Sequence, residues 1–370
     1  MIPVCEPVLD GREMEYVLDC LETNWISSAG KYIRLFEEKF SQYCGVPFGV
    51  ACSNCTTGLH MSMLALGIGP GDEVIIPDFT LIVSANTVIQ TGARPVLVDV
   101  DPKTWCIDAD LIEAKITPRT KAIMVVHMYG HPCDMEAICA IAEKHHLSVI
   151  EDCAQAHGAE VNGKKAGSFG DVACFSFYGN KILTTGEGGM VLCKDEKLAG
   201  KMRIFRDQGF QEPRFVHDVM GFNYRLTNLQ AAIGVAQVDR IEEKVAAKRR
   251  IGQTYNQLLA GNPDFALPYE ETWAKNVYWM YGILVEKSFG IYKDDLMTKL
   301  KTKGIDTRSF FCPMHMQPVY SGSDPRFPDV SGEYPVSKDL WDRGLYLPSG
   351  LGLERAQMEE VVRKLLECRA

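Results

Sequence analysis

A single lysine, Lys181, lies in the segment FSFYGNKILTTGEGGM between an aromatic-rich, strand-like run and a pair of glycines. Lysine normally occupies a solvated face, so an ordinary loop lysine beside a turn is one interpretation of this position. The small residues on both sides of it favour a second interpretation, in which the amine reaches a bound electrophile. The other polar groups that the fold brings near Lys181 must decide between the two.

Three segments place polar groups where apolar, strand-like runs end. LSVIEDCAQAHGA ends its run with Glu151 and Asp152, whose side chains point to opposite faces of a strand, so that one of them can face a ligand. VACSNCTTGLH leaves its run through a Ser/Asn/Thr turn that opens a helix, and the free N–H groups of a helix N-terminus bind anions. CFSFYGNK brings Ser176 to a third strand end, close in sequence to Lys181.

An anion site, a carboxylate and an amine are together the set that pyridoxal phosphate requires. A lysine holds the aldehyde as a Schiff base, a carboxylate keeps the pyridine nitrogen protonated, and a helix N-terminus with hydroxyls binds the phosphate. Each residue also has a purely structural interpretation, since Asp152 could cap the next turn and Ser176 could be a strand hydroxyl. Thr56 and Thr57 could likewise be ordinary N-caps. Their joint occurrence at strand ends favours the cofactor site.

The elements that must position these groups follow a strand–helix alternation. Two amphipathic helices begin the chain, with apolar residues at helical spacing over 14–21 and 33–43. The apolar runs that follow are FGVACS, EVIIP, PVLVDV, KAIMVVH, LSVIED, DVACFSF and GMVLCK. Continuous apolar runs indicate strands that are buried on both faces. We therefore predict an α/β fold with a mostly parallel central sheet and helices on both sides.

Two domains are expected, a large N-terminal cofactor-binding domain over 1–240 and a small C-terminal domain over 241–370. A long helical stretch without proline, from about Thr227 to Leu259, links them before GNPDFALP breaks the chain. The small α+β domain is predicted from a strand in VYWMYGILVE, a helix over 293–303, a strand in DTRSFF and a closing helix over 354–368.

Composition excludes several classes of function. The formal charge of −9 leaves no broad basic face for nucleic acid. No apolar run approaches the roughly 18 residues that cross a bilayer, and the first residues lack the basic patch and apolar core of a signal peptide. Thirteen cysteines, an odd number without regular spacing, suit a reducing cytoplasm better than a disulfide scaffold. We therefore expect a cytoplasmic protein.

Three motifs that resemble known sites are better explained as structure. Cys52 and Cys55 form a CxxC, but zinc would need a second such pair, and a redox role is the minor alternative. His127, His131 and Cys133 look faintly like metal ligands, although the Gly and Pro among them favour a turn. GIGPGD follows a helix and precedes a strand, the reverse of a dinucleotide fingerprint. We expect no metal site and no dinucleotide site here.

The segments SNCTTGLH, PDFTLIVSAN, IEDCAQAHG, FSFYGNKILTTGEGG and GFNYRLTNLQAAIG, in this order, resemble the DegT/DnrJ family of sugar-nucleotide aminotransferases. The resemblance covers nearly the whole chain and implies the aspartate aminotransferase fold, type I, with pyridoxal 5′-phosphate as cofactor. It implies transfer of an amino group from L-glutamate to C4 of a nucleotide-linked 4-keto-6-deoxy sugar. WISSAGKYI and PMHMQPVY most resemble the family members that make GDP-perosamine, which implies GDP-4-keto-6-deoxymannose as substrate, with a UDP- or dTDP-linked keto sugar as the alternative.

The same resemblance implies roles for individual residues. Lys181 matches the Schiff-base lysine, which also moves the proton between cofactor and sugar. Asp152 matches the carboxylate beneath the pyridine nitrogen, and Gln155 matches the group that hydrogen-bonds the ring hydroxyl. Lys181 argues against relatives that dehydrate the sugar, in which a histidine replaces it. A rival of another class is a non-catalytic regulator, against which the acidic charge and the lack of an added DNA-binding domain argue.

The phosphate of the cofactor has its own implied residues. Thr56 and the backbone at Cys55 match the phosphate cradle, and Ser176 matches a phosphate hydroxyl. Asn223 in GFNYR matches a phosphate ligand that the neighbouring subunit donates, which implies a homodimer with shared active sites. Cys55 departs from the glycine or small residue that is common there, which is tolerable if only its backbone N–H touches phosphate.

Two further positions are left open. Leu81 in PDFTLIV stands where family members often stack an aromatic ring on the cofactor, and leucine gives up that stacking. His157 could face the sugar, or it could equally be a packed or surface histidine.

Overall fold

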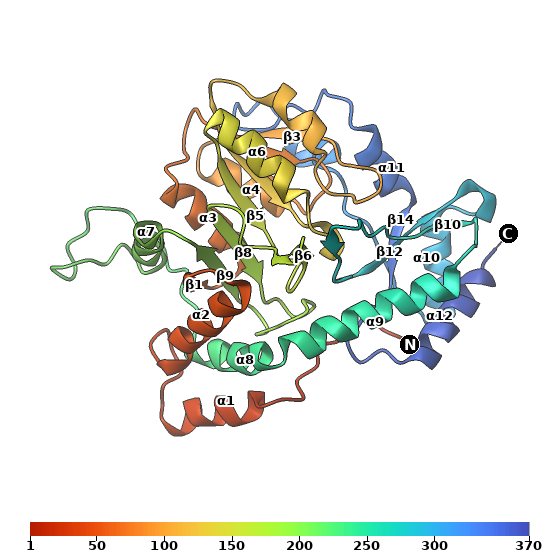
Figure 1. Cartoon of the computed structure of the whole chain (residues 1–370), viewed down its shortest axis with the longest axis horizontal. Coiled ribbons are helices and arrows are strands. Elements are labelled where there is room, and N and C mark those ends of the chain that lie inside the picture. Colours follow the sequence, from red (N-terminus) through yellow and green to blue (C-terminus); the bar gives the residue numbers. More distant parts are fainter. Residues whose placement is uncertain (370) are drawn as a thin grey trace.

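The computed structural model of the chain describes residues 1–369, and a seven-stranded sheet forms its centre (Figure 1). The strand order is β1-β9-β8-β5-β4-β2-β3, and within this sheet only β9 runs antiparallel to the others. Every predicted apolar run forms one of these strands, so the mostly parallel sheet is confirmed. The strands are β1 (Phe48–Cys52), β2 (Glu73–Pro77), β3 (Arg94–Val98), β4 (Thr120–Val126), β5 (Ser148–Asp152), β8 (Val172–Ser176) and β9 (Gly189–Cys193).

Helices cover both faces of this sheet (Figure 1). The covering helices are α2 (Lys31–Cys44), α3 (Cys55–Ala65), α4 (Val83–Gln90), α6 (Met135–His145), α7 (Glu196–Arg206) and α8 (Asn228–Asp239). Strand residues such as Ile75 and Phe175 share one buried cluster with α2, α6 and α8. Their neighbours Ile76 and Cys174 share a second cluster with α3, α4 and α7. Each apolar run therefore fills two cores, because strand side chains alternate between faces.

A second, antiparallel sheet of order β10-β12-β14-β13 lies at the far end of the long helix α9 (Ile241–Leu259) (Figure 1). It shares a third buried cluster with α9, α10 and α12. The strands in VYWMYGILVE and DTRSFF and both predicted helices are confirmed, whereas β10 and β14 were not predicted, because very short strands carry little periodicity. The elements are β10 (Phe265–Ala266), β12 (Tyr281–Val285), α10 (Lys293–Thr302), β13 (Arg308–Ser309), β14 (Gly344–Leu347) and α12 (Arg355–Leu366).

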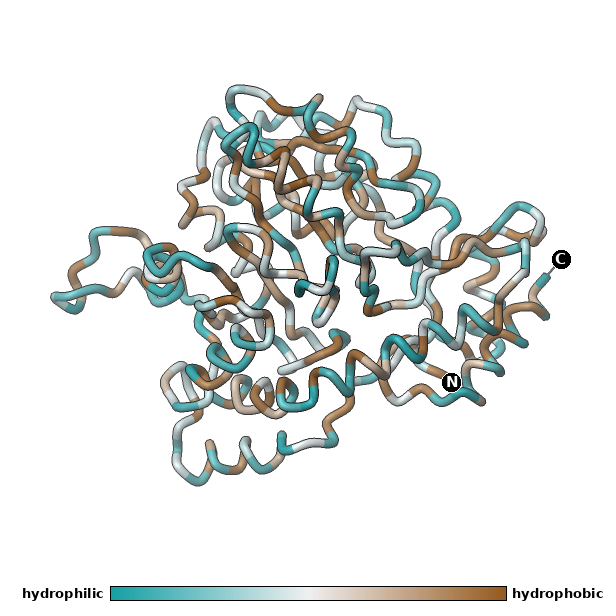
Figure 2. The backbone as a smooth tube through the Cα atoms, viewed as in Figure 1, coloured by the Kyte–Doolittle hydropathy of each residue, from teal (hydrophilic) through white to brown (hydrophobic). Residues whose placement is uncertain are grey.

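The remaining regular elements are short or lie at the periphery. They are α1 (Glu13–Glu22), α5 (Ala109–Ile112), α11 (Pro335–Arg343) and a small sheet of β6 (Glu160–Val161), β7 (Lys164–Lys165) and β11 (Ala274–Lys275). Figure 2 shows apolar stretches along the central strands, while the outer helices alternate between polar and apolar residues. Within residues 1–369, no helix combines the length and the apolar character needed to cross a membrane.

The structure differs from the predicted domain organisation at the linking helix and adds the position of the first residues. The stretch predicted from Thr227 to Leu259 is two helices, because Arg240 leaves the helical conformation between α8 and α9. The first residues lie against the second sheet rather than the first, since Ile2 pairs with Ile305. The division of the chain near residue 240 stays a prediction.

Close packing of α8 on α2 depends on one glycine. A Cβ built on Gly234 of α8 would lie 2.7 Å from the ring of Phe36 on α2. Phe36 is fully buried, and its ring lies edge-on to Phe177 with 4.9 Å between centroids, so it has little room to move away.

We expect Gly234→Ala to destabilise the fold by about 1–2 kcal/mol, because overpacking costs more than the helix propensity that alanine adds. Gly200→Ala in α7 is the matched control, since nothing lies within 4 Å of its built Cβ. That variant should gain roughly 0.5–1 kcal/mol. Urea unfolding of both variants measures the difference. An equal gain for the two alanines would contradict the close contact between α8 and Phe36.

Candidate active site

A cavity of about 420 Å³ lies at the carboxyl ends of β1, β5 and β8. This is where an open α/β sheet is expected to bind its ligand. Residues that are distant in the sequence meet there because the three strands point the same way. Of the residues predicted for the site, those that line the cavity are Cys55, Thr56, Asp152, Gln155, Ser176 and Lys181.

Lys181 lies on the loop between β8 and β9 and reaches into this cavity. Its backbone N–H donates to the carbonyl of Tyr178 at 2.9 Å, and its Nζ lies 3.7 Å from the ring centroid of Trp279. Burial lowers the pKa of the Lys181 amine to about 8, although attraction to the Asp152 carboxylate opposes that shift. A neutral, nucleophilic fraction is therefore present near neutral pH, and the second interpretation of this lysine fits the structure.

Asp152 ends β5, and its buried carboxylate lines the same cavity. Its Oδ1 accepts a hydrogen bond from the Ala154 N–H at 3.0 Å, so the residue caps a turn as well as facing the cavity. Burial raises the pKa of Asp152, and the Ala154 N–H and the Lys181 amine only partly offset this. The carboxylate is thus incompletely stabilised, and a cationic group bound in the cavity would complete its environment.

The N-terminus of α3 also lines the cavity. Asn54 is the N-cap, and its side-chain oxygen accepts the Thr57 N–H at 2.9 Å in a capping box. Thr57 therefore has the structural role, whereas the neighbouring Thr56 lines the cavity. A Cβ on Gly189 of β9 would lie 2.4 Å from the Asn54 backbone, so only glycine allows this approach. Ser176 adds a hydroxyl at the end of β8.

Gln155 has a fixed orientation. Its Oε1 accepts a hydrogen bond from the Tyr129 N–H at 2.7 Å. Because the oxygen is engaged, the amide nitrogen is left as a donor on the cavity side. A donor at this position suits an oxygen acceptor on a bound ligand.

The other predicted positions divide between the cavity and its surroundings. Leu81 lines the cavity with 46% of its surface exposed. His157 is fully buried against Phe175 and Phe177, and this burial lowers its pKa to about 3, so the packed interpretation is the correct one. Asn223 is exposed and does not line the cavity of its own chain.

The sequence did not indicate that the second sheet and the loops between its strands (residues 265–347, called the small unit below) contribute a wall of the cavity. Trp279, Phe311 and Tyr346 line the cavity beside Lys181. They lie about 100 or more residues beyond Lys181 in the chain, in segments without polar motifs. The density of aromatic residues in VYWMYG and SFF was the one available signal.

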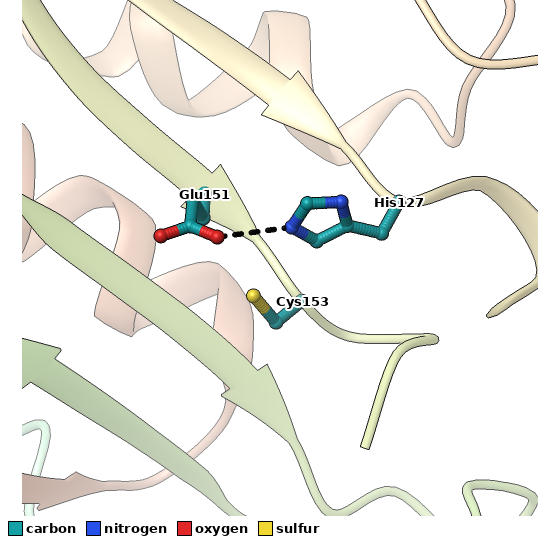
Figure 3. A group of neighbouring side chains, drawn as sticks. All are labelled: His127, Glu151 and Cys153. Atoms are coloured by element: carbon teal, nitrogen blue, oxygen red, sulfur yellow. Dashed lines mark hydrogen bonds and ion pairs between the residues drawn. The ribbon is translucent and has the colours of Figure 1, made fainter. Parts of the chain in front are cut away.

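Glu151 points away from the cavity, as strand alternation requires. Its carboxylate, His127 and Cys153 form a group whose potential metal-ligating atoms lie within 4.8 Å of one another (Figure 3). Three backbone N–H groups in the range 167–170 donate to Glu151 at 2.7–2.8 Å, and His127 Nε2 lies 3.2 Å from it. Burial alone would raise the pKa of Glu151, but these donors outweigh it and lower the pKa. The carboxylate is thus an anchor for a loop.

The histidine ring nitrogens near this anchor are also engaged. His127 Nδ1 accepts the Cys133 N–H at 3.0 Å, while the His131 ring lies 2.7 Å from the Pro132 carbonyl and accepts the Glu271 N–H at 3.2 Å. These bonds hold a turn, as predicted.

The CxxC cysteines are both buried, and burial raises the thiol pKa of Cys52 to about 12 and that of Cys55 well above its usual value. Thiols that stay protonated are poor redox groups, which leaves the minor redox alternative without support. GIGPGD connects α3 to β2, also as predicted.

Glu151→Gln should destabilise the fold by about 3 kcal/mol, because an amide offers one oxygen where three N–H donors need acceptors. The exposed Glu143→Gln is the matched control and should change little. Since the folded pKa of Glu151 is lowered, its contribution is present above its ordinary pKa of about 4.5 and is lost as the pH falls through the folded value. In urea unfolding, the difference in free energy of unfolding between wild type and variant should stay constant from pH 7 to about pH 4.5 and narrow as the pH falls further. If the difference in free energy of unfolding between wild type and Glu151→Gln does not depend on pH, the ionised form of Glu151 does not stabilise the fold.

Comparison with known proteins agrees with this geometry. The sequence pattern of the DegT/DnrJ/EryC1/StrS aminotransferase family matches residues 7–366. The chain is 47% identical to GDP-perosamine synthase of Caulobacter vibrioides, over 98% of this chain and 97% of that protein. It is 43% identical to GDP-perosamine synthase of Escherichia coli O157:H7, over 99% and 98%. Among solved structures, the aminotransferase TlmJ of Streptoalloteichus hindustanus superposes with a TM-score of 0.92 at 31% identity, covering 100% of this chain and 98% of TlmJ. The predicted fold type is thereby confirmed.

Proposed function

Because the chain belongs to the DegT/DnrJ/EryC1/StrS aminotransferase family, we propose that it moves an amino group from L-glutamate to C4 of GDP-4-keto-6-deoxymannose and so makes GDP-perosamine. The observation that carries this choice is 47% identity to a GDP-perosamine synthase over nearly the whole of both chains. The cofactor is pyridoxal 5′-phosphate. We place the reaction in the cytoplasm, where thirteen unpaired cysteines would stay reduced.

The residues in the cavity fit this cofactor. The buried and incompletely stabilised Asp152 suits a protonated pyridine nitrogen. The N-terminus of α3 with Thr56 and Ser176 suits the phosphate, and the free amide of Gln155 suits the ring hydroxyl. When bound, pyridoxal phosphate supplies an electron-accepting ring that stabilises negative charge on the reacting carbon.

The chain's own groups then supply binding and proton transfer. Lys181, whose amine has a pKa of about 8, can take up a proton from one carbon and return it to another near neutral pH. Asp152 stabilises positive charge on a group bound in the cavity. Contacts to the nucleotide, remote from the ketone, would hold the sugar in position.

A homodimer with shared active sites is part of the proposal. The segment 207–226, which holds Asn223, reaches away from the sheet beside α7 (Figure 1). It exposes 73% of Phe215 and 86% of Met220. Helix α1 also exposes an apolar stripe that includes Leu18. Exposed apolar surface of this kind is typical of an interface, and it supports placing Asn223 at the phosphate site of a partner subunit.

Glutamate should convert the absorbance of the loaded enzyme from the aldehyde form of the cofactor to the amine form. Lys181→Ala should abolish turnover with the keto sugar, because no other side chain replaces its amine at the reacting carbon. The exposed Lys197→Ala is the matched control and should keep wild-type turnover. Absorbance spectra and product analysis by mass spectrometry measure both effects. Turnover by Lys181→Ala near the wild-type rate would refute the catalytic assignment, and an unchanged wild-type spectrum would favour a non-catalytic regulator.

GDP-4-keto-6-deoxymannose should be preferred over UDP- and dTDP-linked 4-keto-6-deoxy sugars by at least tenfold in kcat/KM. Guanine presents an exocyclic amine and a ring N–H, which a matching site would satisfy with buried acceptors. When a pyrimidine is bound instead, these acceptors stay without a partner, at a cost of about 1–3 kcal/mol. Steady-state rates with each nucleotide sugar and glutamate measure the preference. A preference for a UDP or dTDP sugar would overturn the substrate but not the aminotransferase reaction.

A further inference from the structure

Trp279, from the small unit, makes two separate contacts with the Lys181 segment. The amine of Lys181 lies over its ring, 3.7 Å from the centroid. Its indole Nε1–H donates to the carbonyl of Asn180, the residue before Lys181, at 2.8 Å. The tryptophan is buried and lines the cavity. One contact is thus with the reacting atom and the other with the backbone that carries it.

The position of Trp279 is itself fixed from the other side by a buried lysine. Lys248 of α9 is fully buried, and its Nζ donates to the Trp279 carbonyl at 2.8 Å and to the Ser349 carbonyl. The Ser349 hydroxyl in turn accepts the Tyr281 N–H at 2.9 Å. These bonds fix the backbone of Trp279, whereas the bond from its indole Nε1–H to the Asn180 carbonyl orients the ring so that its face lies toward the amine.

The ring face discriminates between the two forms of the amine. An aromatic face attracts a cation and has no comparable attraction for a neutral amine, and 3.7 Å is well within the range of about 6 Å for this interaction. Removal from water acts in the opposite sense, because it favours the neutral form. A simple apolar wall would provide only the second effect.

We propose that Trp279 is a catalytic residue that stabilises the Lys181 ammonium formed when this amine, released from the cofactor, has taken up a proton. The inference deepens the proposed function and rests on it, because the proton transfer described next is a step of the proposed aminotransferase reaction. In that step the bond between the reacting carbon and its hydrogen breaks, the proton moves to the lone pair of Lys181 Nζ, and the electron pair stays on the carbon. Trp279 stabilises the resulting ammonium until the proton is returned to the other carbon.

The test is the pKa of the Lys181 amine in the full-length chain. Mass spectrometry follows the pH dependence of trace acetylation at Lys181 in two samples. One is the protein without cofactor, and the other is the cofactor-loaded enzyme after treatment with glutamate. Wild type sets the reference pKa, which burial lowers from the ordinary value of 10.5. Trp279→Leu should lower it by about one unit, because the cation–π contribution is lost, and Trp279→Phe should fall between them.

Trp341→Leu is the matched control, because its ring lies 3.9 Å from the amine of Lys293, away from the cavity. It should leave the Lys181 value unchanged. If Trp279 is only a wall, Trp279→Leu admits water and the pKa stays or rises toward 10.5, and either result overturns the proposal. Trp279→Phe keeps a ring in place and decides the question should the leucine variant fail to fold. Failure of the proposed function would show instead in wild type, as no response of the cofactor to glutamate.

Discussion

Burial of a carboxylate and an amine in one cavity is the constraint on which the rest of this structure depends. Burial raises the pKa of Asp152 and lowers that of Lys181 to about 8, so each group is pushed toward its neutral form. Burying these two groups is unfavourable for folding, and a bound ligand with complementary charges would stabilise them. The sheet, the N-terminus of α3 and the small unit all serve to hold these two groups in place.

Two adjacent carboxylates show how strongly local environment decides a role. Glu151 accepts three backbone N–H bonds, and its pKa is lowered. Asp152 accepts one, and its pKa is raised. The pleat of β5 alone sends them to opposite faces of the sheet. One therefore anchors a loop, whereas the other is left with capacity for a ligand.

The cavity is a joint product of the two sheets. The large sheet contributes the charged and hydroxyl groups at its strand ends, and the small unit contributes an aromatic wall that includes Trp279. A buried lysine on α9 ties that wall to the backbone after β14 through carbonyl acceptors. The chemistry of Lys181 consequently depends on how well the small unit packs against the large one, and not only on the segment that carries the lysine.

The sequence alone determined the strands of the large sheet and their mostly parallel arrangement, because continuous apolar runs are local signals. It placed Asp152, Ser176 and Lys181 at strand ends, while Gln155 and the roles of Cys55 and Thr56 came from the family resemblance. It also specified the family, through motifs spread over nearly the whole chain. Only the tertiary structure decided which interpretation applied to His157, which is packed in the core. It alone placed Trp279 on the amine of Lys181, a contact between residues 98 positions apart that depends on how the two units pack. Such contacts leave no local pattern, since periodicity reports which face of an element is buried but not what lies against it.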